Sequence, residues 1–162
     1  FGLLTLAKRM ERSIVIVANK ALDKEAHTVI ADGAINIWWN NERDASLLLL
    51  LAYLLKKNSE WRTRPIRILR PVPYKADVMS ISAAMREMLE GARIEAEIVI
   101  LPCANPTFAV RTAMQPSAVL FASFDPPDED NEAATAARMK KIVALPGDVL
   151  LVYNAGYNSL QA

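Results

Sequence analysis

The sequence predicts an α/β fold in which a doubly wound, mostly parallel sheet lies between two layers of helices. From residue 34 onward, short apolar or β-branched runs alternate about four times with stretches of helical periodicity, and the series closes on a strand. The strand runs are almost continuously apolar, which is typical of parallel strands buried on both faces in a three-layer fold. The chain has 162 residues, 52% of them hydrophobic, which is enough for one self-sufficient core.

The N-terminal segment is predicted to contain one helix and one strand. Residues 1–12 can form a short helix whose overlapping apolar faces include Leu3, Leu4 and Leu6. Residues 13–18 have the sequence Ser-Ile-Val-Ile-Val-Ala, and such a β-branched run favours a strand.

The polar stretch 19–33 is predicted to be a connecting loop. It contains the only histidine of the chain, His27, which we expect to face solvent. This connector is predicted to divide the chain into two parts, residues 1–33 and an α/β subdomain over residues 34–162. We expect the two parts to pack together as one compact domain.

The strands of the α/β region are recognised by apolar runs between turn residues. We expect them at 35–39, 66–72, 96–101, 118–124 and 148–153. Successive strand residues point to opposite faces, so the neighbouring Trp38 and Trp39 cannot form one aromatic platform. Each is predicted to pack under a different helix layer.

The helices follow from apolar residues at helical spacing. We expect them at 45–57, 77–91, 107–114 and 129–143, with Asp77 capping the second and Gly91 ending it. The first contains the run Leu47–Leu55, which is much shorter than the roughly 20 apolar residues of a membrane span. It is therefore predicted to be a deeply packed helix, and its dipole favours Lys56 and Lys57 at its end.

Charge and cysteine content exclude several classes of protein. The chain has 19 basic and 18 acidic residues, and this balance argues against a nucleic-acid-binding protein or a polybasic membrane-surface protein. The single cysteine, Cys103, permits no internal disulfide and is expected to be buried and inert.

No cofactor or metal site is predicted. The five glycines include no G-x-G or G-x-x-G pair, and the turn 125–130 combines two prolines with four acidic residues that would repel phosphate. One histidine and one cysteine cannot make a zinc site, and the acids of 125–130 lack the spacing of a calcium loop. No serine–histidine motif is recognisable, so we expect a domain without catalytic activity.

Four separated motifs also carry a family likeness, in one order along residues 34–162. The first motif is Ile-Asn-Ile-Trp-Trp at 35–39, followed by the leucine-rich run 47–55, Trp61 and Ile-Arg-Ile at 66–68. The other three motifs are residues 90–98, the strand and double proline of 118–127, and residues 149–156. Together they resemble the cytosolic C-terminal region of cation-chloride cotransporters. Asn40–Asp44 stands where animal members have an Asp-Gly-Gly turn, and the animal regulatory insertion is absent, which favours a prokaryotic member.

The resemblance implies a part of a larger transporter. Its membrane helices move chloride together with potassium or sodium, and its cytosolic region contains two related halves of the universal-stress-protein type. This chain resembles the second half. The resemblance therefore implies a cytoplasmic regulatory and dimerisation domain, with two partners: a second copy and the membrane transport domain of the same polypeptide.

Exposed apolar residues near both ends are candidates for the dimer contact. They are Leu3, Leu4 and Leu6 in the first helix, and Tyr153, Tyr157 and Leu160 in the last strand and tail. The alternative is a free-standing universal-stress-type nucleotide-binding protein, which the missing glycine loop disfavours. A small hydrolase or transferase is a third interpretation, disfavoured because the sequence shows no nucleophile–base pair.

Overall fold

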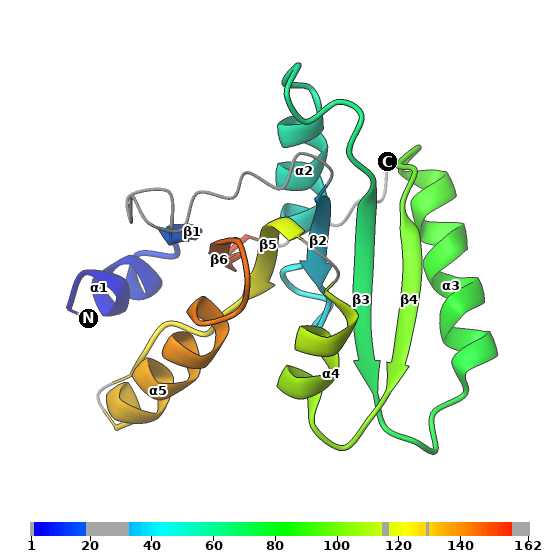
Figure 1. Ribbon diagram of the computed structural model, residues 1–162. Coiled ribbons are helices and arrows are strands. Elements are labelled where there is room, and N and C mark those ends of the chain that lie inside the picture. Colours follow the sequence, from blue (N-terminus) through cyan, green and yellow to red (C-terminus); the bar gives the residue numbers. More distant parts are fainter. Residues whose placement is uncertain (1, 19–32, 115–116, 129, 157–162) are drawn as a thin grey trace.

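One mixed sheet of six strands forms the centre of the computed structural model, which describes residues 2–18, 33–114, 117–128 and 130–156 (Figure 1). The strands are β1 (Ile14–Ala18), β2 (Ala34–Trp38), β3 (Ile66–Val72), β4 (Glu97–Pro102), β5 (Ser117–Ser123) and β6 (Asp148–Tyr153). The helices are α1 (Gly2–Arg9), α2 (Ala45–Lys56), α3 (Val78–Gly91), α4 (Pro106–Ala113) and α5 (Glu132–Val143). All the strands predicted from β-branched and apolar runs are present.

The strand order is β1-β6-β5-β2-β3-β4. Strands β2 to β6 run parallel, and β1 pairs antiparallel with β6 at one edge. The chain starts the parallel part at β2, builds outward through β3 and β4, and then returns to the other side of β2 with β5 and β6. The winding direction therefore reverses between β2 and β5, which confirms the prediction of a doubly wound, mostly parallel sheet.

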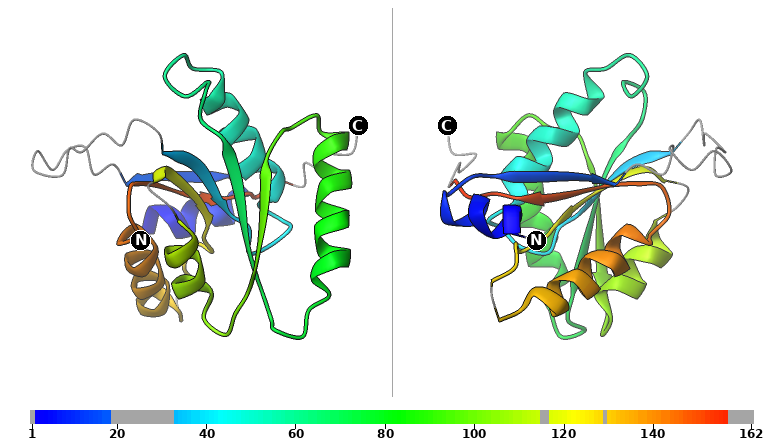
Figure 2. Two further views of the ribbon diagram at one scale, coloured as in Figure 1. Left: turned by 45° about the vertical axis from the view of Figure 1, so that its right-hand side comes forward. Right: turned by 90° about the vertical axis from the view of Figure 1, so that its left-hand side faces the viewer.

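Helices cover the sheet on both faces (Figure 2). On one face α2 lies over β2 and β5, and α3 lies over β4, around a core that includes Leu48, Leu49 and Phe121. On the other face α1, α4 and α5 pack around a second core that includes Val110 and Ile142. The three-layer architecture predicted from the sequence is confirmed.

The two adjacent tryptophans divide between these cores. Trp38 belongs to the core under α4 and α5, whereas Trp39 belongs to the core under α2. Both are almost completely buried. This confirms the prediction that each packs under a different helix layer.

The end of α3 differs from the prediction that Gly91 stops the helix. Gly91 is still helical, and the left-handed residue is Arg93, with φ 54°. The amide of Ile94 donates to the carbonyl of Leu89 at 3.0 Å, and the amide of Arg93 donates to Glu90 at 3.0 Å. Leu89 and Ile94 belong to the same core cluster. This apolar contact sets where the helix ends.

Two smaller predictions also need correction. Cys103 is half-buried rather than buried, because it follows Pro102 at the end of the edge strand β4. Helix α5 begins at Glu132, three residues later than expected. The side chain of Asn131 accepts a hydrogen bond from the amide of Asp128 at 2.9 Å, and this local turn delays the helix.

We expect Gly91→Ala to raise the free energy of unfolding by about 0.5–1 kcal/mol. Gly91 is exposed and helical, and a methyl group there would meet no atom within 4 Å. Urea unfolding measures the change. The control is Gly147→Ala, which should have the opposite sign because Gly147 has φ 82°. A loss of stability in Gly91→Ala would contradict the assigned end of α3.

Candidate functional site

A ligand-binding site is expected first at the carboxyl ends of β2 and β5. Doubly wound sheets bind ligands in the crevice where the winding direction reverses, and here that point lies between these two strands. The turn after β2 carries Arg43 and Asp44, and the turn after β5 carries Asp125. The end of β6 lies beside β5 and brings Tyr153 and Asn154 to the same place.

Arg43 joins the two turns. Its Nε donates to Asp44 Oδ1 at 3.1 Å, and its Nη2 donates to Asp44 Oδ2 at 3.0 Å. The same Nη2 donates to Asp125 Oδ1 at 2.8 Å. The guanidinium also lies over the ring of Tyr153, 4.9 Å from its centroid. The hydrogen bond with Asp44 is the largest cause that raises the pKa of Arg43, so this guanidinium stays charged.

Asp44 is completely buried, and other groups complete its hydrogen bonds. The amide of Asn154 donates to Oδ1 at 2.8 Å, and Asn41 Nδ2 donates to Oδ2 at 3.0 Å. Asn154 Nδ2 in turn donates to the carbonyl of Arg43 at 3.0 Å. A buried carboxylate requires such partners, because an unpaired charge in the interior is very costly. We call Arg43, Asp44, Asp125 and Asn154 the switch-point network.

This network places groups of the chain itself at the switch point. Two of its members are carboxylates, which would repel a phosphate placed between β2 and β5. Both prolines of the turn 125–130 are buried and have no amide to offer. The arrangement is suited to holding the ends of three strands together rather than to binding a nucleotide.

The acidic turn 125–130 forms ion pairs with other parts of the chain. Asp125 pairs with Arg43 and lies 4.0 Å from Arg138, and Asp128 pairs with Lys8 of α1 at 2.7 Å. These carboxylates therefore connect α1, the start of α2 and α5. Across the described residues, no three potential metal ligands come together.

The structure separates the residues proposed for the dimer contact. Leu3 and Leu6 are 82% and 52% exposed on α1, whereas Leu4 packs into the core below it. Tyr153 is half-buried and contacts Phe124, with the two ring centroids 6.5 Å apart. Tyr153 therefore belongs with Arg43 rather than with the leucines of α1. Tyr157 and Leu160 lie outside the described residues.

Sequence reasoning did not identify the edge strand β1 as an exposed apolar surface. Val15 and Val17 are 43% and 61% exposed on the face that carries α2. Val17 also borders an apolar groove of about 290 Å³, which includes Leu51 and Leu55 of α2 and Leu150 of β6. The available signal was the sequence of the strand itself, Ile-Val-Ile-Val-Ala, which contains no charge and no proline.

Sequence reasoning also did not identify the switch-point network. Its only local signal was an arginine–aspartate pair in the turn before the most apolar helix. Asp44 stands at the helix start, as a cap-forming residue would, but makes no capping hydrogen bond with its side chain. That carboxylate is used by partners from distant parts of the chain.

The fold has a match among solved structures, although no family model and no curated protein matches the chain. One matching structure is the crystal structure of the cytoplasmic domain of a prokaryotic cation chloride cotransporter, with a TM-score of 0.69 and 16% sequence identity. This chain has the fold of a part of that cytoplasmic domain. The resemblance that the sequence predicted is confirmed at this level, and the fold is consistent with the universal-stress-protein type.

The match to the cotransporter domain covers 98% of this chain and 59% of that chain. It therefore extends beyond residues 34–162, to which the sequence resemblance was restricted, and includes the N-terminal segment. None of the helices in the described part of the chain has the length and apolar character needed to cross a bilayer.

We expect Asp44→Ala to lower the free energy of unfolding by about 2–3 kcal/mol. The substitution leaves Arg43 and the buried amide of Asn154 without their carboxylate. The matched control is Asp77→Ala, which also removes an aspartate from a helix start. It loses only a capping bond to the amide of Ser80 and should cost about 1 kcal/mol. Chemical denaturation measures both, and equal losses would contradict the role of Asp44.

Proposed function

We propose that this chain is the cytosolic regulatory and dimerisation domain of a cation-chloride cotransporter, with no catalytic activity of its own. The observation that carries the proposal is the match, over 98% of the chain, to the cytoplasmic domain of such a transporter. The motifs at 35–39 and 47–55 point independently to the same family. The transporter moves chloride by symport with potassium or sodium, and this domain lies on the cytoplasmic side.

Two partners follow from this role. One is the membrane transport domain of the same polypeptide, whose activity the cytosolic domain regulates. The other is a second copy of the chain. Because a dimer joins two identical surfaces around a two-fold axis, the surface used has to be complementary to itself.

Strand β1 is the surface that best fits pairing between two copies. Exposed edge strands are normally protected by charges, prolines or bulges against pairing with another chain. The opposite edge strand, β4, has Glu97 at its start and Pro102 at its end, whereas β1 is uncharged along its whole length. Two β1 strands running antiparallel around a two-fold axis would continue the sheet from one copy into the other.

Apolar side chains on both faces favour the same contact. Pairing of β1 strands would cover Val15 and Val17 on the face that carries α2. On the other face α1 presents Leu3 and Leu6, the exposed pair among the leucines proposed from the sequence. Tyr153 is engaged by Arg43 and contributes less. Tyr157 and Leu160 remain candidates from the sequence.

We expect Val17→Lys to abolish dimer formation in sedimentation equilibrium. Val17 is 61% exposed, so a lysine can be accommodated in the monomer, while two like charges would meet across the two-fold axis. The control is Met79→Lys on α3, where the methionine is 81% exposed and far from β1 along the sheet. This variant should dimerise like the wild type. A wild-type chain that stays monomeric at high concentration would contradict the contact.

The transport role has a separate test. We expect the reading frame that encodes this chain to encode membrane helices as well. Its complete product, reconstituted in liposomes, should take up chloride in proportion to an imposed potassium or sodium gradient. A reading frame without membrane helices, or chloride uptake that ignores both cations, would overturn the proposal.

A further inference from the structure

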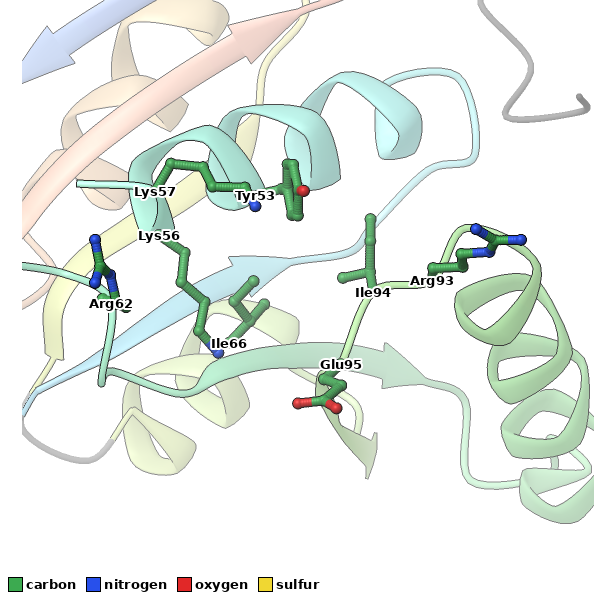
Figure 3. Close-up of a pocket in the computed structure, with 8 residues that line it drawn as sticks. All are labelled: Tyr53, Lys56, Lys57, Arg62, Ile66, Arg93, Ile94 and Glu95. Atoms are coloured by element: carbon green, nitrogen blue, oxygen red, sulfur yellow. The ribbon is translucent and has the colours of Figure 1, made fainter. Parts of the chain in front are cut away.

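A basic cavity of about 430 Å³ lies at the end of the sheet opposite the switch-point network, where β3 and β4 begin (Figure 3). Lys56 and Lys57 come from the end of α2, and Arg62 from the turn that follows. Arg93 and Glu95 come from the segment between α3 and β4. Segments that are distant in sequence thus bring four basic side chains and one acidic side chain around one hollow.

The helix ends explain only part of this charge. The C-termini of α2 and α3 each carry about half a negative charge, which favours nearby cations. These two ends and Glu95 amount to about two negative charges against four positive ones. Within the described lining, about two positive charges therefore remain without compensation. The net charge of the whole chain is only +1, so this excess is a local property of the cavity.

The basic groups of the cavity also differ from other basic groups in their partners. In the part of the chain that the structure describes, Lys8, Arg43, Arg67 and Arg70 each have an acidic partner within 3.0 Å. None of the four basic groups of the cavity forms an ion pair with a described residue. Lys57 instead lies 4.5 Å from the centroid of the Tyr53 ring.

Arg93 adds an independent observation. It occupies the left-handed position after α3, where glycine is favoured and a side chain costs about 1 kcal/mol. Gly91, only two residues earlier, lies where no glycine is required. Backbone strain of this kind is often kept where the side chain has a function.

The side chains surround an apolar floor. Figure 3 shows Lys56 reaching down from α2 toward Ile66, with Arg62 and Arg93 on opposite sides of the cavity. Ile66 is buried at the start of β3, and Ile94 packs against the core. The floor is therefore part of the buried core, and the basic side chains come from its surroundings.

We propose that this cavity binds a phosphate group with two negative charges, carried either by a free phosphorylated compound or by a lipid headgroup. Lysine provides a compact positive charge for phosphate, and arginine provides paired N–H donors that match its oxygens. The proposal does not rest on the transport role, because it uses only the charges and geometry of the cavity.

The test compares two charge-matched double variants. Lys56→Gln/Arg62→Gln removes two charges from the cavity, and Lys140→Gln/Lys141→Gln removes two exposed charges from the last turn of α5. Calorimetry with inorganic pyrophosphate at low salt measures the free ligand. Cosedimentation with phosphatidylcholine vesicles, with and without phosphatidic acid, measures the lipid headgroup.

We expect the cavity variant to bind at least about tenfold more weakly than the wild type, and the α5 variant to bind like the wild type. Cavity-dependent binding of pyrophosphate identifies a free ligand, and cavity-dependent binding of phosphatidic acid vesicles alone identifies a lipid. Failure to bind either probe, or equal loss in both double variants, would overturn the proposal.

Arg93→Gly separates binding from folding. Glycine relieves the left-handed backbone, so the variant should unfold at a higher urea concentration than the wild type. It also removes one cavity charge and should bind severalfold more weakly. A variant that is more stable and binds as tightly as the wild type would show that Arg93 plays no part in the site.

Discussion

The buried carboxylate of Asp44 is the contact on which the arrangement of the carboxyl end of the sheet depends. Through Arg43 it joins the turn after β2 to Asp125 after β5, and through the amide of Asn154 it joins both to the end of β6. Apolar packing favours burial but has little directional preference. The hydrogen bonds of Asp44 supply that direction, because each partner satisfies the charge only in one geometry. The ends of three parallel strands are thus fixed relative to one another by a single charged group.

The two ends of the sheet therefore have opposite characters. At the carboxyl end, where doubly wound folds normally bind ligands, the switch point between β2 and β5 carries the chain's own ion pairs. The amino end has a cavity between the ends of α2 and α3, whose described lining carries an excess of positive charge. The sheet retains the winding order of nucleotide-binding folds, but its ion-paired carboxylates lie at the carboxyl end and its basic cavity lies at the amino end.

The fold was predictable from the sequence to the extent that it depends on local patterns. Strands β3 and β6 were predicted with their observed bounds because their β-branched and apolar residues end at turn residues. The separation of Trp38 from Trp39 followed from strand geometry alone. The switch-point network was not predictable, since Arg43 and Asp125 belong to turns 82 residues apart. The end of α3 was missed for a similar reason: the core contact of Leu89 with Ile94 outweighs the local preference of Gly91.

The pairing of β1 with β6 has a consequence for biosynthesis. Ile14 pairs with Tyr153, so β1 cannot pair until β6, at the far end of the sequence, has been synthesised. Such a distant pairing slows folding, because a long loop has to be closed before the contact forms. During that delay an uncharged Ile-Val-Ile-Val-Ala segment has no neighbour, and segments of this composition aggregate readily. The growing chain is therefore a natural client for chaperones that shield extended apolar segments until β6 is available.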